Sequence, residues 1–141
     1  MEKDKNTCDS FQEHVHEFLF STMLAAPFDK TKLLHNHRVA GVTGSVIPTP
    51  GGGHVHQIFV NTDFFFNHFH EVTVTTGPAI LIRDGDGNII GHVHAIIGTT
   101  SCTFFHTHDF KGTTLIQNPL APIGCIAFPP DSSDWLKFEE D

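Results

Sequence analysis

The chain has 141 residues, 39% of them hydrophobic, and a formal net charge of −8 with histidine neutral. This length suits one domain, and the negative charge argues against a nucleic-acid partner. The sequence has neither an apolar run of about 18 residues that could span a membrane nor the apolar start of a signal peptide. We therefore expect a cytoplasmic protein, with assembly on a cell or spore surface as the alternative.

Three parts are predicted in chain order. Residues 1-13 form an N-terminal arm, in which Cys8 could cross-link to a neighbouring chain. Residues 14-130 form an all-β domain of about nine to twelve short strands. It is built from three internal repeats of about 38 residues, at 14-53, 54-91 and 92-130, that form a compact sandwich, barrel or trefoil-like fold. Residues 131-141 form an acidic tail.

Six His-x-His pairs mark the repeats, and no histidine lies outside them. Each repeat begins with a leading pair and continues to a trailing pair on a second strand, which we expect to form a hairpin with the first. The leading pairs are His14/His16, His54/His56 and His92/His94, and the trailing pairs are His35/His37, His68/His70 and His106/His108. The first repeat carries an insertion around residues 25-32, which predicts a loop. An Asp-Gly tip between aliphatic runs predicts a further hairpin over residues 80-90.

Strand alternation predicts that the histidines face inward. Residues i and i+2 of a strand share a face, so His68 and His70 lie with Val72, while Glu71 lies on the other face. A buried polar group without a partner costs about 1 to 3 kcal/mol. A metal ion bound by neutral imidazole nitrogen removes this cost, so all twelve histidines are candidate metal ligands. A ladder of hydrogen bonds between histidines or to the backbone, or a pH-sensing cluster, is the alternative.

Two arrangements of the sites stay open. Either each repeat closes its own four-histidine site, or pairs from different repeats or chains meet at shared sites. Zinc is the first choice for a tetrahedral nitrogen site, with copper and nickel as alternatives. Because protonated imidazole does not bind metal, we expect binding to strengthen as the pH rises through about 6.5 and to fail at about pH 5.

Charged side chains are scarce in the middle of the chain. Between His35 and Phe128 there are eight, namely Arg38, Asp63, Glu71, Arg83, Asp84, Asp86, Asp109 and Lys111. That is about a third of the share expected for a soluble domain. The sequence therefore predicts that other copies of the chain cover much of this surface, in a homo-oligomer or a fibre.

The cysteines are odd in number and have no Cys-x-x-Cys spacing. They therefore argue against a disulfide scaffold and against a zinc finger with thiolate ligands.

Several short segments resemble those of a known family. They are HNHRVAGVTG at 35-44, GHVH at 53-56, NTDFF at 61-65, HFHE at 68-71, TGPAI at 76-80 and GHVH at 91-94. These segments resemble the YmaF-like family over about residues 14 to 120. The resemblance implies a bacterial source and a histidine-rich core, and it assigns no activity.

The residues favour a non-catalytic, metal-binding structural protein that self-assembles, as a fibre or shell subunit. A metalloenzyme is one alternative, because catalytic zinc is often held by three histidines beside an open position. A metal storage or sensing module is another. Cupin enzymes also use His-x-His, but they add a glutamate a few residues later. Here Glu17, Glu71 and Asp109 follow their pairs directly and so point to the opposite face.

Overall fold

A computed structural model describes residues 13–29 and 31–117 of the chain. Cys8, Cys125, most of the predicted arm, the end of the third repeat and the acidic tail lie outside the described residues. Cys102 is exposed and has a free thiol. No helix in the described ranges is long and apolar enough to cross a bilayer.

Short strands make up the described part, which contains no α-helix. The strands are β1 (Glu17–Ser21), β2 (Arg38–Val42), β3 (Ile47–Pro48), β4 (His54–Val55), β5 (Gln57–Asn61), β6 (Glu71–Thr75), β7 (Ala79–Arg83), β8 (Ile89–Thr99) and β9 (Asp109–Thr113). The predicted insertion in the first repeat holds two 3-10 turns, η1 (Pro27–Asp29) and η2 (Thr31–Leu33). The all-β prediction is thus confirmed at the level of a mostly β structure.

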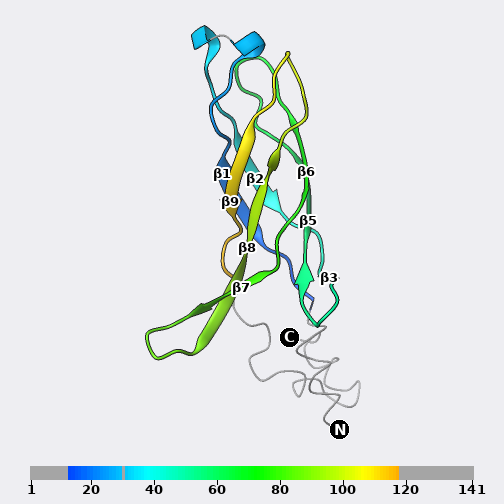
Figure 1. Ribbon diagram of the computed structural model, residues 1–141, viewed down its shortest axis with the longest axis vertical. Coiled ribbons are helices and arrows are strands. Elements are labelled where there is room, and N and C mark those ends of the chain that lie inside the picture. Colours follow the sequence, from blue (N-terminus) through cyan, green and yellow to red (C-terminus); the bar gives the residue numbers. More distant parts are fainter. Residues whose placement is uncertain (1–12, 30, 118–141) are drawn as a thin grey trace, which may run out of the picture. The chain divides into compact units, whose positions relative to one another are not determined.

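Three antiparallel hairpins form the centre of the structure (Figure 1). β1 pairs with β2, β5 with β6, and the second half of β8 with β9, each over five residues. The hairpins also lie beside one another, β2 next to β5, β6 next to β8, and β9 next to β1. Every one of these strands is preceded directly by a His-x-His pair or, in the long β8, contains it. The predicted pairing of the histidine-bearing strands in three hairpins is therefore confirmed.

Two further strand pairs lie outside these hairpins. β3 pairs with β4, and β7 pairs with the first half of β8 around the Asp-Gly tip, as the sequence predicts. At this tip Asp84 Oδ1 accepts hydrogen bonds from the backbone N–H groups of Asp86 and Asn88. β7 and the start of β8 extend away from the hairpins (Figure 1). The strands form four small sheets, so a sandwich, barrel or trefoil-like arrangement stays a prediction.

Each hairpin contributes two buried apolar side chains to one core. The core consists of Phe18, Val39, Ile58, Val72, Ile96 and Phe110, all at most 2% exposed. Glycine faces both phenylalanines across the strand pairs, Gly41 opposite Phe18 and Gly98 opposite Phe110. A Cβ placed at Gly98 would lie 2.8 Å from the Phe110 ring, so the phenylalanine occupies the volume that glycine leaves. The core is therefore matched in volume across these two strand pairs.

This matching predicts that Gly98→Ala destabilises the fold. The added methyl group overpacks the core against Phe110, which costs about 1 to 3 kcal/mol. Chemical denaturation followed by circular dichroism measures the loss. Gly85→Ala is the matched control, because no atom lies within 4 Å of the added methyl group there. Equal stability of the two variants would contradict this account of the core.

Candidate metal centres

The antiparallel hairpins separate the histidine pairs into two clusters. Each pair lies at the N-terminal side of its five-residue strand segment, so the two pairs of one hairpin lie at opposite ends, about 17 Å apart. The leading cluster contains His14, His16, His54, His56, His92 and His94, and the trailing cluster contains His35, His37, His68, His70, His106 and His108. In each cluster the candidate ligand atoms lie within 4.8 Å of one another. The predicted four-histidine site within a single repeat is therefore wrong, and pairs from three hairpins meet instead.

The second histidine of each pair, here called the inner histidine, is fixed by the backbone on both sides. His70 is fully buried and donates its backbone N–H to Thr62 Oγ1 over 3.0 Å. Its carbonyl accepts from Thr62 N over 2.8 Å, and its Nδ1 donates to the carbonyl of Ser101 over 2.9 Å. The other five inner histidines have the same pattern, with Nδ1 donating from His16 to Leu115, His37 to Asp63, His56 to Gly44, His94 to Gly77 and His108 to Met23.

Residues whose carbonyl groups accept from an inner histidine also connect neighbouring hairpins. Ser101, which directly follows Thr100, accepts from His70 and donates its own N–H to the carbonyl of Glu71 over 2.9 Å. Asp63 connects the first and second hairpins in the same way: its N–H donates to the carbonyl of Arg38, and its carbonyl accepts from His37 Nδ1. Each inner imidazole is therefore oriented by a hairpin other than its own, so the clusters form only when the hairpins come together.

The first histidine of each trailing pair, here called the outer histidine, is held by a tight local turn. Nδ1 of His35, His68 and His106 donates to the carbonyl two residues earlier, over 2.8 to 2.9 Å. In two of these turns Phe66 and Phe104 have a φ of 59° and 55°, the left-handed region. That conformation costs about 1 to 2 kcal/mol for a residue with a side chain. The backbone is therefore strained where it aims these two imidazoles, as is common at functional sites.

These bonds decide where the lone pairs of the trailing cluster point. A carbonyl oxygen only accepts, so each Nδ1 bonded to one carries the single proton of a neutral imidazole, and Nε2 keeps its lone pair. This holds for all six trailing histidines. Yet five pairs of these Nε2 atoms lie only 3.0 to 3.3 Å apart, among them His35 with His68 and His106 with His108. Two lone pairs cannot form a hydrogen bond, so these contacts are favourable only with a cation between them.

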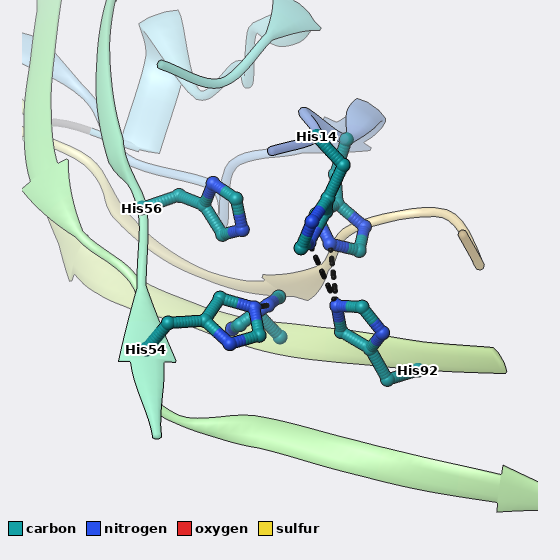
Figure 2. Close-up of side chains that lie close together, drawn as sticks. His14, His54, His56 and His92 are labelled. Atoms are coloured by element: carbon teal, nitrogen blue, oxygen red, sulfur yellow. Dashed lines mark hydrogen bonds between the residues drawn. The ribbon is translucent and has the colours of Figure 1, made fainter. Parts of the chain in front are cut away.

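The leading cluster has the same convergence with more access to solvent. Figure 2 shows the imidazoles of His14, His54, His56 and His92 turned toward one another. Nε2 of His92 lies 3.0 Å from Nε2 of His14, and His56 Nε2 is buried without a hydrogen-bond partner among the described residues. The outer histidines here are half-buried, whereas those of the trailing cluster are at most 7% exposed. Both clusters fit a metal ion, and the leading one is the more accessible.

A comparison with models of protein families assigns the chain to a family. A family model named YmaF, described as spore germination protein GerY/YamF, matches residues 11–116. The chain belongs to the YmaF family. The match covers both histidine clusters in full. Neither a curated protein nor a solved structure matches the chain.

Burial lowers the pKa of nine imidazoles in this YmaF-family protein and so favours their neutral form. Loss of solvation is the largest cause in each case, and neighbouring imidazoles add to it. Together they lower the pKa of His92 to about 3 and that of His54, His70, His94 and His108 to about 4. The sequence alone predicted metal loss at about pH 5 from the ordinary histidine pKa. With these lowered pKa values, retention of metal at pH 5 is compatible with ligation by histidine.

All twelve predicted ligands enter the clusters, and their inward orientation is confirmed for the nine that are buried. Sequence reasoning assigned no role to the six threonines that hold the inner histidines, namely Thr22, Thr43, Thr62, Thr76, Thr100 and Thr114. A signal for them exists, because a threonine follows every inner histidine at a distance of six residues. The pattern His-x-His-x5-Thr therefore occurs six times.

The lowered pKa values predict that metal-free protein loses stability in acid. Below about pH 6.5 the unfolded chain binds protons that the folded chain excludes until about pH 4. Stability from neutral imidazole is thus fully present above about pH 6.5 and is lost as the pH falls toward the folded pKa. Thermal unfolding of chelator-treated protein at stepped pH measures this. A melting temperature that stays constant or rises between about pH 7 and pH 4 would contradict it.

Proposed function

We propose that this protein is a non-catalytic binder of transition-metal ions, in which each histidine cluster holds one ion. The convergence of six Nε2 lone pairs in the trailing cluster carries this proposal. Each cluster takes one pair from each of the three hairpins, so a bound ion cross-links all of them. Metal binding and folding are then coupled, as in other small proteins whose site exists only in the folded state. The matching hairpins support an origin from three repeats of one unit.

We further propose that the metal-bound chains associate with one another. Leu19, Phe59 and Ile97 occupy the same position on the outward faces of β1, β5 and β8, and they are 65%, 75% and 61% exposed. Phe28 and Phe105 stack at 4.5 Å near the trailing cluster, and both are exposed. Exposed apolar side chains on a surface with few charges favour contact with other copies of the chain. The spore germination family supports a role in spores, where such an assembly is a fibre or shell.

A metal-storage role is the second candidate, and it rests on the leading cluster. Its outer residues His14, His54 and His92 are half-buried. An ion held there exchanges with solvent more readily than one in the trailing cluster, where all six residues are buried. Storage or buffering therefore uses the leading cluster, while the trailing cluster holds the hairpins together.

Elemental analysis of the full chain purified at neutral pH tests the proposal. We expect two equivalents of transition metal per chain. Because an ion at a thousand times its Kd stabilises by about 4 kcal/mol, we expect chelation to lower the melting temperature by about 15 °C or more. His68→Ala should weaken metal binding at one of the two sites and leave the other unchanged in a chelator competition, because only the trailing cluster loses a ligand.

Two outcomes separate the parts of the proposal. A purified protein without stoichiometric metal, which also gains none on dialysis against zinc or nickel, would overturn metal binding. Negative-stain electron microscopy of the same sample examines assembly. Uniform single chains that carry two metal ions would reject the fibre or shell and leave the metal-binding role in place.

A further inference from the structure

We propose that each histidine cluster is a six-coordinate, octahedral centre, with all six positions filled by imidazole nitrogen. This inference rests on the proposed metal-binding function and specifies its coordination. It departs from the tetrahedral zinc site that four histidines would form. A centre of this kind selects divalent ions that favour octahedral coordination, such as Fe²⁺, Co²⁺ and Ni²⁺.

The packing of the rings in the trailing cluster has the connectivity of an octahedron. Each imidazole lies edge-to-face against four of the other five, with ring centroids 4.7 to 5.0 Å apart. Across the part of the chain that the structure describes, the pairs without a ring contact are His35 with His70, His37 with His106, and His68 with His108. Every histidine thus has a single opposite partner, as every vertex of an octahedron does. In a trigonal prism each vertex would have three neighbours.

Three hairpins account for this arrangement. The outer histidines form one triangle and the inner histidines a second, and the opposite partner always comes from a different hairpin. His35 of the first hairpin lies opposite His70 of the second, and His68 of the second lies opposite His108 of the third. The two triangles are therefore staggered, which is the octahedral arrangement.

The leading cluster shows the same contacts. His14 lies edge-to-face against His16, His54, His56 and His92, at centroid distances of 4.8 to 5.0 Å. His94 contacts His16, His54, His56 and His92 at 4.6 to 5.1 Å. The two clusters therefore have equivalent ring packing at opposite ends of the hairpins.

The distances between nitrogens fit a first-row ion at the centre. Five pairs of neighbouring Nε2 atoms in the trailing cluster lie 3.0 to 3.3 Å apart. In a regular octahedron the edge is the bond length multiplied by the square root of two, so these edges correspond to metal–nitrogen bonds of about 2.1 to 2.3 Å, close to the known lengths for histidine. The nitrogens of these five pairs are therefore spaced as an octahedral ion requires.

The number of lone pairs argues against a four-coordinate ion. A tetrahedral zinc ion would use four nitrogens of the trailing cluster and leave two buried lone pairs without a partner, at about 1 to 3 kcal/mol each. All donors are nitrogen, which disfavours Mg²⁺, Ca²⁺ and Mn²⁺. With six protein ligands in place, no position is left for water, so the centre cannot activate a nucleophile. The saturated centre therefore fits a structural or storage role.

Visible absorption of cobalt-loaded protein tests the coordination number. Octahedral Co²⁺ absorbs weakly, and tetrahedral Co²⁺ absorbs at least an order of magnitude more strongly at longer wavelength. We expect metal-free full chain to take up two equivalents of Co²⁺ with the weak octahedral spectrum for both. His106→Ala opens one position in the trailing cluster, so its spectrum should intensify. Thr107→Ala is the matched control, because this neighbouring side chain is exposed, and its spectrum should stay unchanged.

Each other outcome has a distinct meaning. Two equivalents of Co²⁺ with the intense tetrahedral spectrum would overturn six-coordination and leave metal binding intact. Absence of Co²⁺ uptake would overturn the metal-binding function itself, and this inference with it. An intense spectrum from one equivalent alone would restrict the octahedral centre to one cluster, and the His106→Ala spectrum then identifies which cluster it is.

Discussion

The hydrogen bond from histidine Nδ1 to a main-chain carbonyl is the interaction on which the rest of the structure depends. Among the described residues, nine imidazoles are seen to make it. It fixes the tautomer, orients the ring and leaves the Nε2 lone pair directed at the centre of a cluster. For the inner histidines the carbonyl belongs to another hairpin. The same bond therefore assembles the fold and prepares the site.

Antiparallel pairing explains why there are two histidine clusters. Each strand of a hairpin begins with a histidine pair, and the two strands run in opposite directions, so one pair lies at each end of the hairpin. Three such hairpins around one apolar core therefore bring three pairs together at each end. Burial at these ends is possible only for neutral imidazole, which is the form that binds metal. The lowered pKa values of His92 and His94 reflect this burial. Burial of the histidine pairs at the hairpin ends thus accounts both for their neutral state and for their ability to bind metal.

Much of this could be predicted from the sequence. Alternation in strands predicts that the two histidines of a pair share a face with Val72 and its equivalents, and these residues are buried. The grouping of the pairs could not be predicted in the same way, because alternation decides the face of a strand and not which strand ends meet. That grouping depends on contacts between hairpins, such as Ser101 with His70. The left-handed turns at Phe66 and Phe104 were also missed, because phenylalanine rarely adopts that conformation.

The central claim is that imidazoles from three hairpins surround a shared metal ion. X-ray absorption at the K-edge of the bound metal measures this most directly, because it counts the ligands and identifies imidazole by its multiple scattering. The account predicts a shell of six nitrogens at about 2.1 to 2.3 Å, all from histidine. A shell dominated by oxygen or sulfur, or one without histidine scattering, would contradict it.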